Sequence, residues 1–519
     1  MVGVPKSDGC APCKRRKIGC DRTWPACRNC QQGRRDCPGP SLRYAKFVDE
    51  GPKQRARRQA AAASDRPCSG VELVRGQDAF CRRACVGLPA AMSPSLADRL
   101  ARHLVETLMK EREEPASQLR MFGPFIGEVP RMLGAAAALD SAANCLADMH
   151  AVTRRGRVGQ TDPTLYGTAL ASLRAAVAHP DEGRSTLTLC AAALMAMTEA
   201  YAVGTCGTNR TFIAHLGGAA QMLRLRGPAA FQDAHSVERA ILRAVTVGIA
   251  LDALFSGRDN ILTEPEWHAV AFDTTGLVEP RLSLNRIARA MSYLPALARD
   301  ARAYHAARHD ESTAKELLAR AASLKGMLAM AGPFVEAAQA DPALMWRAGP
   351  DRLAFANAGI AFSLWFFWAM SIAVDGIAAG LAPQQHDASL ALACVGRARL
   401  LRDSWPWARG CRPLGAMYLD VGLILAHKAL RLWGGEAGDG GEVLEALAGL
   451  SEGARAASAG DAVPWTVEHV ERVGAWLTGG AVDERVALPP NGLRVPSQRQ
   501  ARSEGSDGRR LRTVAGSLP

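Results

Sequence analysis

The sequence CAPCKRRKIGCDRTWPACRNCQQGRRDC, residues 10–37, decides how this chain is organised. Its six cysteines form two Cys-x2-Cys-x6-Cys halves, the second offset by 17 positions from the first. No apolar secretory segment opens the sequence, so we expect a reducing compartment, where a tight cysteine cluster indicates metal ligands before disulfides. The six candidate ligands are Cys10, Cys13, Cys20, Cys27, Cys30 and Cys37.

Counting ligands predicts how this cluster binds metal. Zinc takes four ligands in a tetrahedron, and six thiolates cannot supply four each to two separate ions. They can if two thiolates bridge both ions, because four terminal and two bridging sulfurs make eight bonds. The repeat makes Cys10 and Cys27, the first cysteine of each half, the natural bridges. Each half then supplies the two terminal ligands of one zinc ion: Cys13 with Cys20, and Cys30 with Cys37.

Three other interpretations of the cluster compete with this one. Three disulfides would need an oxidising compartment, which nothing in the sequence indicates. A metallothionein-like metal store would not need the basic run that lies inside the loop. A finger made only from the two Cys-x2-Cys pairs would leave Cys20 and Cys37 without a role. We therefore expect two zinc ions per chain.

A basic run, KRRK, directly follows the second cysteine, so metal binding would fix its position. Residues 1–60 hold 15 Lys/Arg against 5 Asp/Glu, within a chain of formal net charge +12. Such a unit suits double-stranded DNA, whose phosphates provide much of the affinity while one or two side chains read base edges. For the run alone, a nuclear import signal or a solvated surface is the alternative. The candidate DNA contacts are Lys14, Arg15, Arg16, Lys17 and Arg22.

Residues 10–37 resemble the fungal binuclear zinc cluster (Zn2Cys6) transcription factors. The family pattern is C-x2-C-R-x-R-K-x-K-C-D, then a loop that contains proline, then C-x2-C-x6-C. The matching residues besides the cysteines are Arg16, Lys17, Asp21 and Pro25. The resemblance implies that Lys17 reaches the base edges of a CGG triplet, where guanine offers the acceptors O6 and N7. It also implies that Arg16 holds phosphates and that Pro25 shapes the loop.

This sequence departs from the family pattern at two positions. Lys14 stands where arginine is usual, which keeps the charge, and Gly19 stands where lysine is usual, which removes a phosphate contact. We expect weaker DNA affinity with an unchanged base preference. The alternative is a metal-stabilised interaction module that has lost useful DNA affinity, and substitution of Lys17 separates the two.

The segment 91–480 has the pattern of a helical array. Alanine and leucine are abundant, aromatic residues make up 6% of the chain, and no alternating β pattern of useful length is present. Ser93-Pro94 predicts a helix start, which the apolar stripe Leu96, Leu100, Leu104 and Leu108 follows. Further helices are expected over 162–177, 186–201, 212–225, 237–254, 284–305, 314–330, 353–374, 390–403, 414–433, 443–450 and 466–477.

One of these helices is long and apolar enough to cross a membrane. Residues 353–374 carry no formal charge over 22 positions. A buried helix of the array is the interpretation we favour, because Asn357, Gly359 and Ser363 dilute the apolar character and similar helices surround the segment.

Residues 214–231, AHLGGAAQMLRLRGPAAF, are similar to the HLxGAxxLLxLRGPxxF stretch in the regulatory domain of the same fungal factors. The resemblance implies an all-helical regulatory domain that binds partners and sometimes senses a small molecule. His215 within it could suggest catalysis, but we expect a packing or capping histidine. Arg224 and Arg226 are expected to form structural ion pairs.

The sequence thus predicts a mostly α-helical protein with four segments. They are a Zn2Cys6 DNA-binding domain at 1–47, a flexible basic linker at 48–90, an all-helical regulatory domain at 91–480 and a disordered basic tail at 481–519. The linker shows no heptad coiled coil, so monomeric binding and dimerisation elsewhere both stay open. Cys81 and Cys85, three residues apart in it, are expected not to bind metal.

The function expected is a nuclear transcription factor that regulates RNA polymerase II genes. Its partners would be DNA and transcriptional co-regulators, without a membrane. The alternative is a ligand-sensing regulator whose helical domain binds a small-molecule effector and gates DNA binding. The sequence holds no HExxH, GxSxG, GxxxxGK[ST] or GxGxxG motif in a suitable context, so we expect no enzyme.

Overall fold

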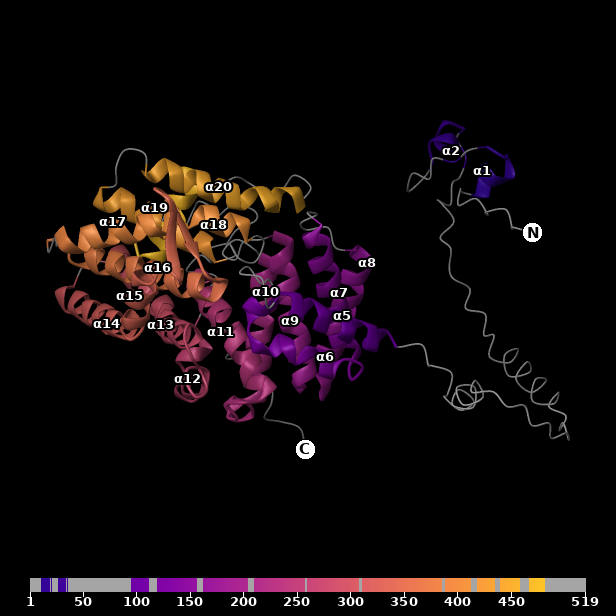
Figure 1. The fold of residues 1–519 in the computed structure, drawn as a ribbon, viewed down its shortest axis with the longest axis horizontal. Coiled ribbons are helices and arrows are strands. Elements are labelled where there is room, and N and C mark those ends of the chain that lie inside the picture. The colour runs from indigo at the N-terminus through magenta and orange to yellow at the C-terminus, as the bar shows by residue number, and fades with distance from the viewer. Residues whose placement is uncertain are drawn as a thin grey trace, which may run out of the picture. The chain divides into compact units, whose positions relative to one another are not determined.

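The computed structural model describes residues 11–18, 20, 27–33, 35, 95–111, 119–155, 162–203, 210–256, 259–307, 310–384, 388–411, 418–434, 439–457 and 466–480. The chain divides into two compact units, residues 1–91 and 92–519 (Figure 1). The expected linker at 48–90, with Cys81 and Cys85, and the expected tail at 481–519 lie outside the described residues. The boundaries of the four expected segments therefore stay predictions.

The first unit contains two short helices that follow the sequence repeat. α1 (Ala11–Arg15) carries Cys13, and α2 (Arg28–Gln32) carries Cys30. Cys27 is the N-cap residue of α2, and its carbonyl accepts the N–H of Cys30 at 3.0 Å. The two cysteines of this pair are thus one helical turn apart, which allows both thiols to face one point.

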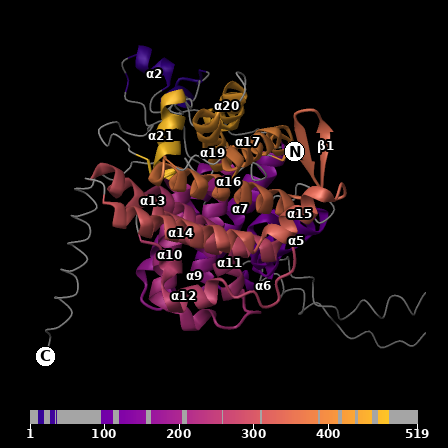
Figure 2. The same ribbon diagram turned by 90° about the vertical axis from the view of Figure 1, so that its left-hand side faces the viewer.

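The described part of the second unit is a helical array with a small hairpin (Figures 1 and 2). Its longer helices are α5 (Leu96–Lys110), α7 (Ala137–Arg154), α8 (Pro163–Ala178), α9 (Thr186–Val203), α10 (Arg210–Arg226), α11 (Val237–Ser256), α13 (Arg281–Ala306), α14 (Glu311–Ala329), α16 (Ala358–Leu381), α17 (Ala388–Asp403), α19 (Leu419–Trp433), α20 (Asp439–Ala457) and α21 (Val467–Leu477). The shorter elements are α6 (Val129–Met132), α12 (Pro265–Ala271), α15 (Gly332–Ala340), α18 (Trp405–Gly410) and the 3-10 turns η2 (Leu119–Phe122), η3 (Pro124–Gly127), η4 (Glu182–Arg184), η5 (Pro228–Phe231) and η6 (Ile261–Thr263).

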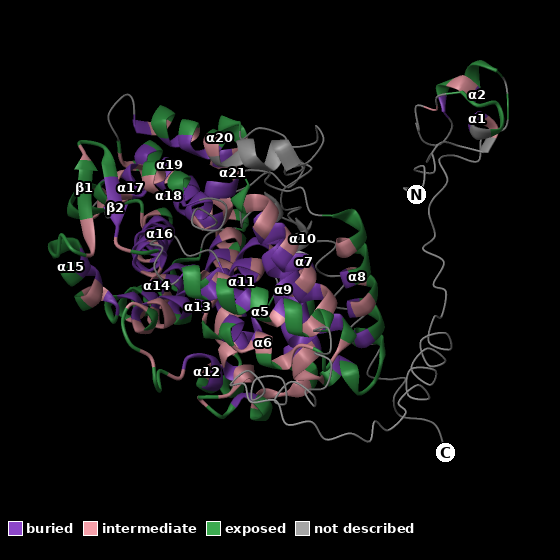
Figure 3. Cartoon of the chain, turned by 45° about the vertical axis from the view of Figure 1, so that its right-hand side comes forward, coloured by how far each residue is buried: buried purple, intermediate pink, exposed green. Residues whose placement is uncertain are grey.

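One continuous apolar core holds these helices together. α9 packs against α7 and α10, and α16 packs against α13, α14, α17 and α19. Figure 3 shows the buried residues, in purple, concentrated in the interior of the helical array, with the exposed residues, in green, mostly on its outside. The expectation of a mostly helical protein is confirmed for the described residues.

The apolar segment that could have crossed a membrane is the central helix of this core. α16 is the only described helix that is long and apolar enough to span a bilayer, and 94% of its most apolar 18-residue window is buried. Trp365 and Trp368 are each 1% exposed. The interpretation as a buried helix is confirmed, because other helices cover the surface that lipid would have to contact.

The start of this helix was predicted wrongly. Residues 353–355 belong to β2 (Arg352–Phe355), which pairs antiparallel with β1 (Met345–Gly349), and Pro350 and Asp351 form the turn between them. Asn357 caps the helix by accepting the N–H of Ile360 at 3.1 Å. Strands of four and five residues are too short to show an alternating pattern, which explains why the sequence indicated no strand.

The start of the first long helix also differs from the prediction. Ser95, not Ser93, is its N-cap, and a reciprocal pair of hydrogen bonds with Asp98 completes a capping box. Leu96 therefore lies at the first helical position and is 57% exposed. The buried stripe consists of Leu100, Leu104 and Leu108.

We expect Gly479→Ala to lower the free energy of unfolding of the second unit by about 3 kcal/mol. Gly479 has φ +68°, and a Cβ there would lie 2.6 Å from Ala301 Cβ and 3.3 Å from the carbonyl oxygen of Ala298, both in α13. Gly434→Ala is the matched control, because Gly434 has φ +79° but nothing within 4 Å of an added Cβ. The control should lose only about 1 kcal/mol, from the left-handed backbone alone. Urea unfolding measures both, and equal losses would refute the close contact with α13.

Candidate metal centre

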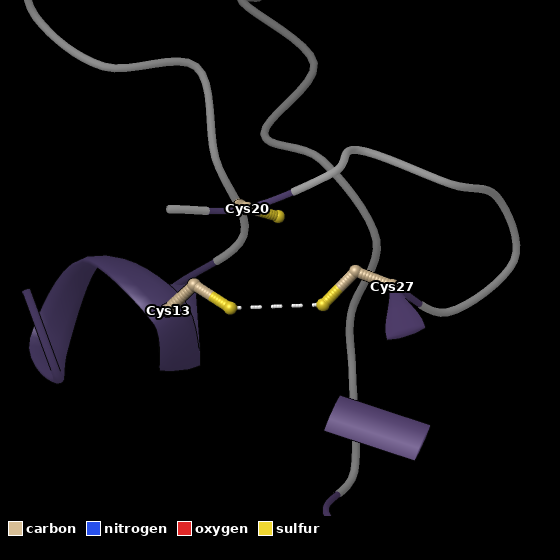
Figure 4. A group of neighbouring side chains, drawn as sticks. All are labelled: Cys13, Cys20 and Cys27. Carbon is tan, nitrogen blue, oxygen red and sulfur yellow. Dashed lines mark hydrogen bonds between the residues drawn. The ribbon is translucent and has the colours of Figure 1, made fainter. Parts of the chain in front are cut away.

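Three cysteine sulfurs come together in the first unit (Figure 4). The Sγ atoms of Cys13, Cys20 and Cys27 all lie within 4.8 Å of one another, and those of Cys13 and Cys27 are 3.6 Å apart. Cys13 and Cys27 are each 1% exposed, and Cys20 is partly buried. Cys13 lies in α1 and Cys27 caps α2, 14 residues later, so the loop between the helices brings them together and local helix geometry does not.

The distances suit a shared metal ion and not a disulfide. Two sulfurs of a tetrahedral zinc site with Zn–S bonds of about 2.3 Å lie about 3.8 Å apart. The 3.6 Å between the sulfurs of Cys13 and Cys27 is close to that value and far from the roughly 2.05 Å of an S–S bond. Because thiolates are ligands that zinc prefers, this group of three cysteines could hold a metal ion.

The other three expected ligands are not part of this group. Cys30 is buried with Cys13 and Cys27 in a small core of its own, apart from the large core of the second unit. Cys10 and Cys37 lie outside the described residues. The second zinc ion and the two bridging thiolates therefore stay predictions.

The basic residues that follow Cys13 are exposed to solvent. Arg15, Arg16 and Lys17 are all exposed. Lys14 lies in α1, but its side chain is outside the described part, and so is Arg22. Three of the five candidate DNA contacts thus follow directly on the buried thiol of Cys13, with nothing between them and solvent.

Lys17 has an unusual backbone conformation. Its φ of 54° makes it the one non-glycine residue of the described ranges with a positive φ. It ends α1 in a Schellman turn, in which the N–H of Ile18 donates to the carbonyl of Cys13 at 3.2 Å. Glycine is the usual residue at such a position, and a side chain there costs about 1–2 kcal/mol. No sequence signal indicated this strain. The direction of the Lys17 side chain is therefore set by the same turn that carries Cys13, a candidate metal ligand.

His215, the one histidine with a catalytic alternative, lies in a buried polar cluster of the second unit. Its Nε2 is 4.0 Å from Oε1 of Glu199, whose carboxylate accepts a hydrogen bond from the hydroxyl of Tyr166. Burial lowers the pKa of His215 and raises the pKa of Glu199. At neutral pH His215 is therefore uncharged and packs between helices, as expected. The sequence did not indicate Glu199 or Tyr166 as its neighbours, because the three residues come from three different helices.

The two arginines near His215 form the structural contacts that were expected. Arg224 lies 3.6 Å from Glu264, and Arg226 lies 3.6 Å from Glu238 and donates to the carbonyl of Arg184 at 2.7 Å. These contacts join α10 to neighbouring segments, so the prediction of ion pairs is confirmed.

Three cysteines of the second unit have thiols whose pKa is raised. Burial raises the pKa of the thiols of Cys190 and Cys411 to about 12, and burial together with Asp375 raises that of Cys394 to about 12. A thiol with such a pKa stays protonated at pH 8, and a protonated thiol is neither a good nucleophile nor a metal ligand.

We expect alkylation to separate the two sets of cysteines. In the native full chain at pH 8, iodoacetamide should leave Cys190, Cys394 and Cys411 unmodified, with or without a chelator. Cys13 and Cys27 should be protected as isolated and become modified after chelation, because removal of the metal releases their thiolates. Peptide mass spectrometry measures each site. A labelling rate for Cys13 and Cys27 that chelation does not change would argue against a bound metal.

Comparison of the chain with protein-family models, with curated proteins and with solved structures finds no match. The family resemblance therefore rests on the two sequence motifs at 10–37 and 214–231.

Proposed function

We propose that this protein is a nuclear, zinc-dependent transcription factor of the Zn2Cys6 type that binds CGG-like triplets and regulates RNA polymerase II genes. The observation that carries the proposal is the junction at α1. There the buried Cys13, one of three cysteines whose sulfurs lie close together, is followed after Lys14 by the exposed residues Arg15, Arg16 and Lys17. A metal ligand inside a basic loop connects metal binding to the position of the DNA-contacting side chains.

Zinc would be held first by Cys13, Cys20 and Cys27, with Cys10 as the fourth ligand. Cys30 and Cys37 would hold the second ion together with the shared thiolates of Cys10 and Cys27. The bound ions supply folding energy, because a unit of this size has too small an apolar core to hold its shape alone. Two zinc ions and six thiolates carry a charge of −2, so residues 1–60 remain strongly positive with metal bound.

The roles proposed for the basic residues are those that the family resemblance implies. Lys17, fixed in the Schellman turn, is proposed to donate to O6 and N7 of guanine in the major groove. Arg15 and Arg16 are proposed to hold phosphates, which gives affinity without sequence preference. Lys14 and Arg22 are proposed to add to the phosphate contacts.

The helical unit is proposed to be regulatory and not catalytic. Its polar clusters, such as Glu199 with His215 and Tyr166, are buried among packed helices and join elements of the fold. The unit would bind co-regulators, and monomeric and dimeric forms of the factor are both compatible with the proposal. An effector that gates DNA binding is the second candidate, and a cavity in this unit favours it.

The test is selection from a randomised pool of double-stranded DNA with the full chain at a stated salt concentration. We expect a CGG-containing motif to be enriched, and a chelator to remove the enrichment. Salt-sensitive binding that enriches no motif would refute sequence-specific recognition while leaving the metal centre in place. Enrichment that a chelator leaves unchanged would refute zinc dependence.

A further inference from the structure

The second unit contains a cavity of about 430 Å³ that is open to solvent on one side and is lined by η2, η3, α11, α13 and the start of α16. This volume lies within the range of about 300–1,000 Å³ that small-molecule sites occupy. All of its lining residues belong to the second unit, so the site depends neither on the cysteine cluster nor on the function proposed for it.

Part of the cavity lining is apolar and aromatic. Phe122, Leu284, Phe362 and Phe366 contribute to it. Tyr418 braces the two α16 rings, with its ring centroid 5.4 Å from that of Phe362 and 5.1 Å from that of Phe366. Because packing holds these rings in place, a flat hydrophobic ligand could enter without rearranging them.

Another part of the lining is cationic. Arg120, Arg243 and Arg281 all line the cavity. Arg120 and Arg281 are exposed at the mouth of the cavity; Arg120 donates to the carbonyl of Leu108 at 3.2 Å, and neither arginine forms an ion pair with a carboxylate in the described part of the chain. The Nε of Arg243 is buried and has no hydrogen-bond partner there. A buried donor without a partner is costly, so the cavity lacks an acceptor beside the Nε of Arg243.

The one carboxylate among the lining residues does not neutralise these arginines. Glu111 is 3% exposed; its Oε1 lies 2.9 Å from Nε2 of His150, and its Oε2 accepts the N–H of Leu119 at 2.9 Å. Asp273 lies 4.0 Å from Arg243 but is held at 2.8 Å by Arg239. The cavity therefore has an excess of positive charge.

We propose that this cavity binds a small aromatic monocarboxylate, with the ring against Phe122, Phe362 and Phe366 and the carboxylate against Arg120 and Arg281. Guanidinium groups suit a carboxylate because they present paired N–H donors in a plane. A neutral ligand would leave the arginines unneutralised, and a cation would be repelled.

The electrostatic state of the arginines supports this choice of charge. Burial lowers the pKa of Arg281, and the positive charge of Arg120 lowers it further. Burial and the neighbouring Arg239 lower the pKa of Arg243, and Asp273 only partly opposes them. Burial and the neighbouring arginines disfavour the charged guanidinium groups, and a bound anion would offset both effects.

Isothermal titration of the full chain with 2-naphthoate, and with 2-naphthamide as the neutral analogue of the same shape, tests the proposal. We expect naphthoate to bind at least roughly tenfold more tightly than the amide. Arg281→Gln should weaken naphthoate binding by roughly tenfold or more and leave amide binding unchanged. Arg131→Gln is the control, because Arg131 has an 81% exposed side chain and lies outside the cavity lining.

Each contrary result overturns the proposal. These results are no naphthoate binding by the folded chain, equal affinity for acid and amide, or an Arg281→Gln variant that binds naphthoate as the unmodified chain does. If Arg281→Gln fails to fold, as judged by its thermal unfolding, Arg120→Gln decides the matter on the same terms. Failure here would leave zinc binding and DNA selection unaffected, so the two proposals fail separately.

Discussion

Cys27→Ala should lower affinity for the selected DNA site to the level of non-specific binding, a loss of about 10³-fold or more. Cys27 is the proposed bridge, and its Sγ lies 3.6 Å from that of Cys13. Its removal takes one ligand from each zinc ion, so both ions should be lost and the loop that presents the basic residues should lose its shape. Fluorescence anisotropy of labelled DNA measures the affinity, and metal analysis measures the zinc content.

Two variants make this prediction specific. Cys13→Ala removes a terminal ligand, so it should weaken one zinc ion before the other, whereas Cys27→Ala should release both together. Cys190→Ala is the control, because Cys190 is buried in the helical core and should leave zinc content and DNA affinity unchanged. If Cys13→Ala and Cys27→Ala lose zinc in the same way, Cys27 is not a bridge.

Lys17→Ala should reduce affinity for the CGG-containing site by about 1–3 kcal/mol, roughly 5- to 150-fold, and relax the base preference at one position of the triplet. The zinc content should not change, because the side chain of Lys17 is exposed and its removal should not disturb the packing around the metal ligands. Repeating the DNA selection with the variant measures the preference.

Lys17→Gly separates the side chain from the backbone. Glycine adopts the φ of 54° without strain, so this variant should hold zinc at least as well as the unmodified chain while losing the same base preference as Lys17→Ala. Arg15→Ala is the matched control among the exposed basic residues; it should weaken binding to all sequences alike and reduce the salt dependence by about one charge. A base preference that survives both Lys17 variants would move the specificity to another residue.

The sequence predicted more of the metal centre than the described residues show: six ligands and two zinc ions, against three sulfurs that lie together. The spacing of the cysteines indicated which thiols share a metal, and Cys13, Cys20 and Cys27 do come together. The strained turn at Lys17 could not be predicted, because lysine gives no sign of a left-handed backbone and only the hydrogen bond from Ile18 to Cys13 reveals it.

The sequence predicted the helices that have long amphipathic or apolar patterns. It did not predict the features of the helical unit that depend on tertiary contacts. The buried α16 was expected, but its start was misplaced, since a short hairpin and the Asn357 cap take the residues before it. The cavity was not indicated at all. Arg120, Arg243 and Arg281 lie far apart in the sequence and share one surface only because η2, α11 and α13 pack together.

The zinc content of the purified full chain tests the central claim most directly. Native mass spectrometry before and after treatment with a chelator counts the bound ions, and a chain with Cys27→Ala serves as the comparison. The account predicts two zinc ions per chain, both absent from the Cys27→Ala variant. One ion or none in the unmodified chain would contradict the two-zinc cluster and, with it, the argument that metal binding fixes Lys17 for DNA.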